Sequence, residues 1–196
     1  MLPGAAPARE HAPQPDRALT RLLTAGRTYA SGRGTRFEVK ESTPERLRFR
    51  RTYPAGTGKA DPHVHLDFIQ QWTVVEGYGR VAIDGDESEI GPGEEVRVEA
   101  GIGHRDPYNP AGDPLVIDWL LEPHNDFIVA FGDAYVWMLE RDRLNEQDEF
   151  PALQLMTILR ATRARSFAVG PPRAVQKAFI PVAAALGRVR GYRARY

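Results

Sequence analysis

The sequence predicts a mainly β fold with a C-terminal α-helical extension, on the basis of three observations. Short runs of alternating apolar and polar residues, separated by Gly- and Pro-rich turns, fill residues 35–122. After Pro123 the apolar residues instead recur at helical spacing. The chain of 196 residues is long enough for one sizeable core but short for two full domains. Many short strands at regular spacing are typical of a β-sandwich or a β-barrel.

Residues 1–27 are expected to form a flexible N-terminal arm. Four prolines fall within the first fifteen residues, and no apolar run precedes a small-residue cleavage site, so we expect no signal peptide. A short helix is predicted at Arg17 to Arg27. The plain expectation is a cytoplasmic protein.

Residues 28–123 are expected to form the β-barrel. Phe68 to Glu76 and Arg80 to Ile83 flank the EGYG turn, and we interpret the two segments as a hairpin. The Asp-Gly pair within IDGD, residues 83–86, predicts a second hairpin. Further strands are predicted at Leu47–Tyr53, Glu95–Val98 and 114–122.

Residues 124–196 are expected to form a helical extension with a basic tail. Apolar residues at helical spacing predict three helices, at Phe127 to Leu139, at Leu153 to Leu159 and at Val175 to Val189. The basic tail, residues 175–196, mixes apolar and basic residues, namely Phe179, Val182, Leu186 and Val189 with Arg188, Arg190, Arg193 and Arg195.

Charge is unevenly distributed along the chain, although the net charge is zero. Residues 61–149 hold 5 Lys/Arg and 21 Asp/Glu, whereas residues 150–196 hold 9 Lys/Arg and no Asp or Glu. The acidic middle excludes a nucleic-acid groove there, because phosphate binding needs clustered cations. The basic tail has two interpretations: an amphipathic segment in weak contact with an anionic membrane surface, or a helix docked on the barrel or on a partner subunit. The second is favoured, because the acidic middle can complement the arginines of the tail.

His63 and His65 are the most informative polar residues. Alternate residues of a strand point to the same face, so both imidazoles are expected to enter one space. His104 follows a Gly-rich turn, at a strand position able to join them. The chain has no cysteine, so any metal must be held by imidazole, carboxylate or amide oxygen. Metal binding is the favoured interpretation, and a metal-free cluster is the alternative.

Two motifs around these histidines resemble those of the cupin superfamily. In the first motif, Gly56 or Gly58 precedes His63-Val-His65, and Gln70 and Gly77 follow. In the second motif, Gly93 precedes Glu99-Ala-Gly101-Ile-Gly103-His104, and Asn109 follows. The resemblance covers about residues 35–122, and the segment is similar to single-domain, cupin-2-like barrels.

The resemblance implies a jelly-roll barrel that holds a divalent metal such as Fe, Mn, Ni, Zn or Cu. The ligands that it implies are His63, His65, Gln70 and His104. Most cupins have Glu where this chain has Gln70, and Pro where it has Glu99. An amide oxygen can still ligate, but the loss of a negative charge is expected to weaken metal binding and to favour an anionic substrate. Asp67 is a substitute ligand if its strand continues regularly, because it would then share a face with His65.

Three aromatic residues and one further histidine complete the candidates. Tyr108 is the aromatic residue best placed to contact a substrate, because in a regular strand it shares a face with His104. Trp72 and Trp119 are expected to lie in the core. His124 is expected to be a local polar residue at the start of the first helix rather than a ligand.

The resulting hypothesis is a cupin-barrel protein that binds a divalent metal and a small organic ligand. Within the family, the expected chemistry is that of a metal-dependent dioxygenase or an isomerase/cyclase, and no catalytic residue is identified. Two alternatives stay open: a non-catalytic small-molecule binding or sensor protein, and a membrane-surface scaffold acting through the basic tail. A homodimer is expected, because pairing of two barrels would cover exposed edge strands.

Overall fold

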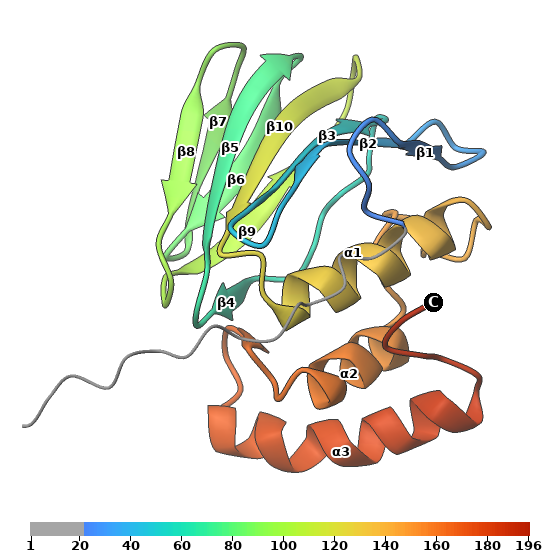
Figure 1. Ribbon diagram of the computed structural model, residues 1–196. Coiled ribbons are helices and arrows are strands. Elements are labelled where there is room, and N and C mark those ends of the chain that lie inside the picture. Colours follow the sequence, from blue (N-terminus) through green and yellow to red (C-terminus); the bar gives the residue numbers. More distant parts are fainter. Residues whose placement is uncertain (1–21) are drawn as a thin grey trace, which may run out of the picture.

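The computed structural model describes residues 22–196, and its strands form two antiparallel sheets (Figure 1). One sheet has six strands in the order β1-β2-β3-β10-β5-β8, and the other has five in the order β11-β4-β9-β6-β7. The strands are β1 Thr28–Ala30, β2 Arg36–Ser42, β3 Leu47–Tyr53, β4 His63–His65, β5 Ile69–Glu76, β6 Gly79–Ile83, β7 Asp86–Ile90, β8 Glu95–Val98, β9 Gly103–Tyr108, β10 Leu115–Glu122 and β11 Ser166–Ala168. The predicted mainly β jelly-roll barrel with a C-terminal helical extension is confirmed.

The core lies between the inner faces of the two sheets. Strand β10 buries every second residue from Leu115 to Leu121, and its partner β3 does the same from Leu47 to Tyr53. This alternation follows from the pleat of a strand, which sends successive side chains to opposite faces. Phe49 stacks between Phe37 and Trp119, with ring centroids 4.3 Å and 5.3 Å away.

Strands β5 and β6 do not form the predicted hairpin, and that prediction was wrong. β5 pairs with β8 and β10, whereas β6 pairs with β7 and β9. Between them Gly77 has φ +77°, and a Cβ atom there would lie 2.5 Å from the Pro114 carbonyl oxygen. The chain therefore crosses from one sheet to the other at this turn. The second predicted hairpin is present as β6 and β7.

The described part of the predicted N-terminal helix is not helical. Residues 17–21 of that prediction lie outside the described residues, and residues 22–27 form bends and a turn. Gly26 has φ +85°, and its N–H donates to the Val39 carbonyl at 2.8 Å. The backbone of this segment is thus committed to pairing with β2, which a helix would prevent.

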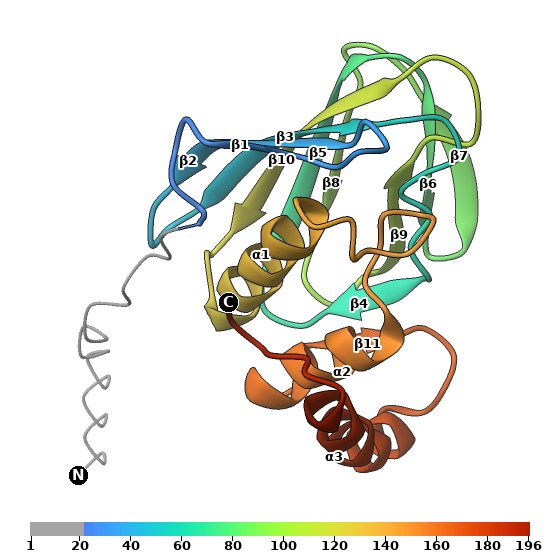
Figure 2. The same ribbon diagram turned by 90° about the vertical axis from the view of Figure 1, so that its right-hand side faces the viewer.

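Three helices follow the barrel: α1 Asp126–Leu139, α2 Ala152–Ala161 and α3 Arg173–Val189. In Figures 1 and 2, α1 lies directly below the sheets, and α2 and α3 form a further layer beyond it. The close packing of α3 on α2 depends on Gly187, since a Cβ atom there would come within 2.8 Å of the Leu153 carbonyl oxygen and 2.5 Å of Thr157 Oγ1. Among the helices of residues 22–196, none combines the length and the hydropathy of a membrane-spanning segment.

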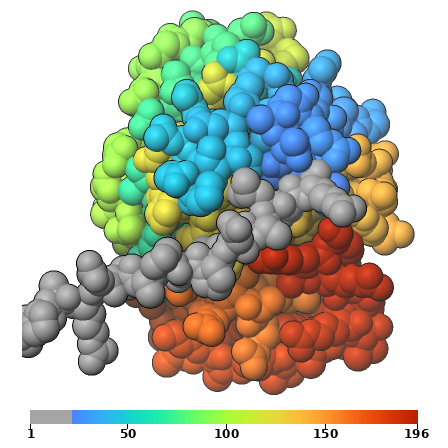
Figure 3. All heavy atoms as spheres, in the orientation of Figure 1, coloured from blue at the N-terminus to red at the C-terminus, as the bar shows by residue number. Residues whose placement is uncertain are grey.

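The helical extension also supplies a strand that the sequence did not predict. β11 pairs with β4, so that Ser166 lies opposite His65 and Ala168 opposite His63. Figure 3 shows the C-terminal residues, orange to red, gathered in one block against the barrel. Residues 124–196 therefore help to enclose the strand that carries the two adjacent histidines.

Candidate metal centre and its cavity

The structure brings His63, His65 and His104 together. His63 and His65 lie on β4, and His63 is directly opposite His104 in the pairing of β4 with β9. The ring centroids of His63 and His104 are 4.5 Å apart, and those of His63 and His65 are 4.7 Å apart. One ring nitrogen from each residue lies within 4.8 Å of the other two. The shared strand face predicted from the sequence therefore produces a three-imidazole cluster.

Backbone carbonyls fix the tautomer of two of these rings. Nδ1 of His63 donates to the Asp61 carbonyl at 2.8 Å, and Nδ1 of His104 donates to the Ile102 carbonyl at 3.0 Å. A carbonyl can only accept, so each Nδ1 carries the proton and the neutral ring has a lone pair on Nε2. This arrangement, with the second ring nitrogen held by a carbonyl, is typical of histidines that bind metals.

Gln70 reaches the cluster from the other sheet. It lies on the inner face of β5, and its amide nitrogen donates to Nε2 of His65 at 3.0 Å. The side-chain oxygen of Gln70 and Nδ1 of His65 are both buried without a hydrogen-bond partner among the described residues. Gln70 thus contacts a cluster histidine directly.

Burial keeps the inner two imidazoles neutral. The pKa of His65 is well below its ordinary value, because burial and then the neighbouring His63 and His104 disfavour a charge. Burial also lowers the pKa of His104, although Asp106 acts in the opposite direction. Both rings are therefore neutral near pH 7, which is the form that binds a metal ion.

Asp106 is a site residue that the sequence analysis missed. Its Oδ2 lies 3.6 Å from Nε2 of His63, and its Oδ1 lies 3.7 Å from Nε2 of His104. Asp106 follows His104 by two residues on β9, the same spacing that relates His63 to His65. That spacing is the sequence signal that could have identified it.

The donor set fits a divalent transition metal. Among residues 22–196, Nε2 of His104 and Oδ1 of Asp106 are buried polar atoms without a hydrogen-bond partner. Such atoms are costly in a folded protein unless a water molecule or an ion satisfies them. Imidazole nitrogen with carboxylate or amide oxygen suits Fe, Mn, Ni, Zn and Cu better than a hard ion such as Ca²⁺.

Three other candidates lie away from the cluster. β4 ends at His65, so Asp67 does not share its face, and instead accepts from Arg165 Nη1 at 2.8 Å. The hydroxyl of Tyr108 donates to Glu87 at 3.0 Å, and Tyr108 is not among the residues that line the cavity next to the cluster. A register shift between β6 and β9 removes the regular alternation that would place Tyr108 beside His104. Nδ1 of His124 donates to the Thr43 carbonyl at 2.8 Å.

A cavity of about 550 Å³ opens beside the histidines. His63, His65, Gln70 and Asp106 belong to its wall. Its apolar part is largely aromatic and includes Phe37, Phe49, Phe68, Trp119, Phe127, Phe131, Phe150 and Phe167. Helices α1 and α2 and strand β11 supply part of this wall, so the C-terminal extension completes a space that the barrel alone leaves open.

An ion pair between the buried Arg51 and the partly buried Glu149 lines another part of the same cavity. Nη2 of Arg51 lies 3.3 Å from Oε1 of Glu149, and the guanidinium stacks on the rings of Tyr53 and Tyr135 at 4.3 Å and 4.8 Å. Burial raises the pKa of Glu149 to about 7, while Arg51 lowers it and Asp106 raises it. Glu149 is therefore a carboxyl group that can gain or lose a proton near neutral pH.

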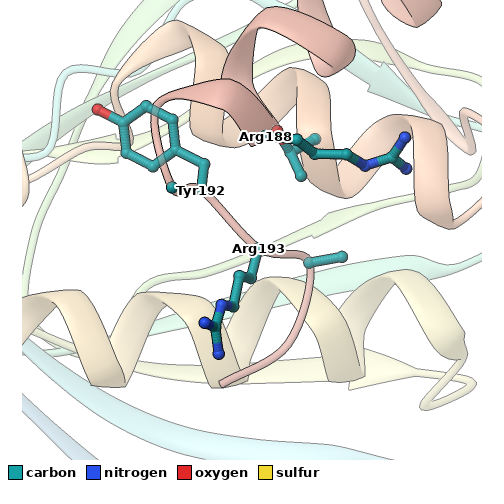
Figure 4. Close-up of a pocket in the computed structure, with 6 residues that line it drawn as sticks. Arg188, Tyr192 and Arg193 are labelled. Atoms are coloured by element: carbon teal, nitrogen blue, oxygen red, sulfur yellow. The ribbon is translucent and has the colours of Figure 1, made fainter.

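A second hollow, of about 430 Å³, lies where α3 ends against α2 (Figure 4). Arg188 and Arg193 contribute to its lining, but in Figure 4 their guanidinium groups point away from each other. They do not converge on one ligand group, so this hollow is not a candidate anion site.

Comparison with known proteins finds one family model that matches part of this barrel. Residues 49–121 match the family model of the cupin domain. Among solved structures, KdgF from Halomonas sp. is 24% identical with a TM-score of 0.44, and the match covers 52% of this chain and 90% of that chain. An RmlC-like cupin from Shewanella frigidimarina is 18% identical with a TM-score of 0.43, covering 53% of this chain and 89% of that chain.

A third solved structure is the sugar phosphate isomerase of the cupin superfamily from Silicibacter pomeroyi. It is 17% identical with a TM-score of 0.40, and the match covers 45% of this chain and 59% of that chain. No curated protein matches the chain. The strands that carry the three histidines lie inside the segment that matches the cupin domain, and the C-terminal helices lie outside it.

Proposed function

We propose that this protein binds a divalent transition metal and a small organic ligand in the cavity beside it. The observation that carries the proposal is the pair of Nε2 lone pairs of His63 and His104, held in place by backbone carbonyls beside His65. A bound Fe, Mn, Ni, Zn or Cu ion would act there as a Lewis acid and as a template for the ligand.

The cavity favours a ligand with a polar end and an apolar or aromatic body. The polar end would lie at His63, His65 and Asp106, and the body would pack against the aromatic wall. A volume of about 550 Å³ is within the range of ordinary small-molecule sites. Arg51 places a permanent positive charge in the same cavity, which supports a ligand with an anionic group.

An enzymatic role needs a group that moves protons, and Glu149 is the residue best suited to it. Its side chain lines the cavity, and its pKa of about 7 matches the operating pH of a general acid or base. Arg51 orients the carboxyl through the 3.3 Å ion pair. This group supports a metal-dependent dioxygenase or an isomerase/cyclase over a purely structural barrel.

Non-catalytic ligand binding is the alternative role of the same cavity. A screen of small organic acids by thermal shift, run on metal-loaded and on chelated protein, separates the two roles. Stabilisation that requires the metal, followed by turnover of the same compound, supports the enzyme. Stabilisation that survives chelation, without turnover, supports the sensor and contradicts the metal-dependent function.

A further inference from the structure

We propose that Asp106 supplies the carboxylate of the metal centre, from a different strand than the glutamate that most cupins carry at the position of Gln70. This inference rests on the proposed metal binding and assigns it a further ligand. It changes the expected donor set from three imidazoles and an amide to one that includes a negative charge.

The carboxylate of Asp106 bridges the two histidines whose tautomers are fixed. One oxygen lies 3.6 Å from Nε2 of His63, and the other lies 3.7 Å from Nε2 of His104. The side chain of Asp106 lies in the cavity wall and is 21% exposed. It is therefore close to the cluster without being sealed off from an entering ion.

The side of each ring that faces Asp106 is free of the backbone. Nδ1 of His63 and of His104 donates to a backbone carbonyl, so Nε2 is the ring nitrogen that each histidine turns towards Asp106. A cation between these nitrogens and the carboxylate would be attracted by the negative charge of Asp106. Distances of 3.6 Å and 3.7 Å exceed those of a hydrogen bond, so no shared proton accounts for the approach.

The spacing of Asp106 from two of the three histidines also agrees with shared coordination. Ligand atoms at about 2.0–2.2 Å from a metal and at tetrahedral or octahedral angles lie roughly 3.0–3.5 Å from one another. The observed 3.6 Å and 3.7 Å need only a small inward shift of the side chains to reach this range.

Gln70 and Asp67 also carry a candidate ligand oxygen, but neither places it beside His63 and His104 as Asp106 does. Gln70 directs its amide nitrogen to His65, and its oxygen belongs to a neutral group. Asp67 is held by Arg165 at 2.8 Å and accepts from the Asn125 amide at 3.3 Å. Within residues 22–196, Asp106 is the carboxylate that lies within 4.0 Å of the cluster imidazoles.

The test compares metal affinity in Asp106→Asn and in Asp67→Asn, a matched control two residues from His65. Full-length protein is stripped with chelator and titrated with Co²⁺ and Zn²⁺ by calorimetry, and Co²⁺ absorption is recorded as a signature of the ligand set. We expect Asp106→Asn to weaken binding at least about tenfold and to change the Co²⁺ spectrum. Asp67→Asn is expected to stay within about twofold of the wild type in affinity.

The remaining outcomes separate the assignment of Asp106 as a ligand from the proposed metal binding itself. If the wild type binds one equivalent and Asp106→Asn binds equally well with the same spectrum, Asp106 is not a ligand, while the proposed function stands. If the wild type binds neither ion nor any other divalent transition metal, the proposed function fails and this assignment with it. Thermal melting of the apo proteins checks folding, and Asp106→Ala repeats the comparison if the amide variant does not fold.

Discussion

Gln70 is the residue at which this chain departs from the usual cupin pattern, and its contact with His65 makes the departure testable. Gln70→Glu adds a negative charge beside neutral imidazoles, so we expect it to tighten divalent metal binding. Competition titration against a chromophoric chelator measures the change. Weaker binding in Gln70→Glu would show that position 70 lies outside the ligand sphere.

The raised pKa of Glu149 predicts that the stability of the folded protein depends on pH. Its pKa of about 7 in the folded protein exceeds the ordinary value of 4.5, so the folded state holds the proton more tightly than the unfolded chain. The stability that this group contributes is present below about pH 4.5 and is lost as the pH rises through about 7.

We therefore expect the free energy of unfolding of the wild type to fall by about 1–2 kcal/mol more than that of Glu149→Gln between acidic and mildly alkaline pH. Urea denaturation of apo protein across this range measures both curves. Parallel curves for the two proteins would mean that Glu149 titrates at an ordinary value.

The sequence located the three histidines because strand alternation and two motifs in register both place them on one face. Asp106 has the same spacing from His104 but belongs to neither motif, and so it was missed. Asp67 and Tyr108 were misplaced for a common reason, since both predictions assumed a regular strand. The end of β4 at His65 and the register shift opposite β9 break that regularity.

At the scale of elements, helix α1 positions Phe127 and Phe131 in the cavity wall and begins at a well-formed cap. Oδ1 of Asn125 accepts from the N–H groups of Phe127 and Ile128, each at 3.0 Å. Asn125→Ala is expected to lower the free energy of unfolding by about 0.5–2 kcal/mol, because two helix N–H groups lose their partner. Chemical denaturation checks the value.

Asn125→Ser is the matched control for this cap, since a serine hydroxyl can accept from the same N–H groups. We expect it to keep most of the stability that Asn125→Ala loses. Equal destabilisation by both variants would assign the effect to the amide contact with Asp67 rather than to the cap.

Most elements could be predicted from the sequence, because each has its own periodicity and turn residues. The pairing partners of each strand could not be predicted from the sequence, because alternation shows which face of a strand is buried but not which strand lies beside it. Strands β5 and β6, which were expected to pair with each other, are the example. β11 was missed because three residues are too few to show a period, and its pairing with β4 depends on the path of the helices. The cavity wall built by residues 124–196 could not be predicted either, because it also depends on the path of the helices.

At the scale of the whole molecule, α3 explains where the apolar residues of the basic tail lie. It packs on α2 through Ile180 and small residues, and leaves a stripe of larger apolar side chains exposed. The stripe consists of Val175, Phe179, Val182, Leu186 and Val189, with Phe179 60% and Val182 69% exposed. Of the tail arginines, Arg195 lies 3.9 Å from Asp126 in the acidic middle, and Arg165, which precedes α3, pairs with Asp67 at 2.8 Å.

The spacing of this stripe favours a second copy of the chain as its partner. The five residues alternate in steps of four and three, the pattern of a helix that packs along another helix. Helical periodicity places Lys177 and Arg188 on the opposite side, so two stripes can meet without like charges between them.

We expect the wild type to be a homodimer at micromolar concentration and Val182→Asp to be a monomer, as measured by light scattering after gel filtration. Lys177→Ser, on the other side of the helix, is the control and is expected to remain dimeric. A monomeric wild type would contradict the prediction, and its co-flotation with anionic liposomes would support the membrane-surface alternative.

The central claim is that the histidine cluster holds one divalent metal, and elemental analysis of the purified full-length chain tests it most directly. The wild type and a His63→Ala, His104→Ala double variant are analysed after purification and again after incubation with Fe, Mn, Ni, Zn or Cu and removal of excess metal. The account predicts one equivalent of metal in the wild type and essentially none in the variant. Sub-stoichiometric metal that none of these ions restores, or equal retention by the variant, would contradict it.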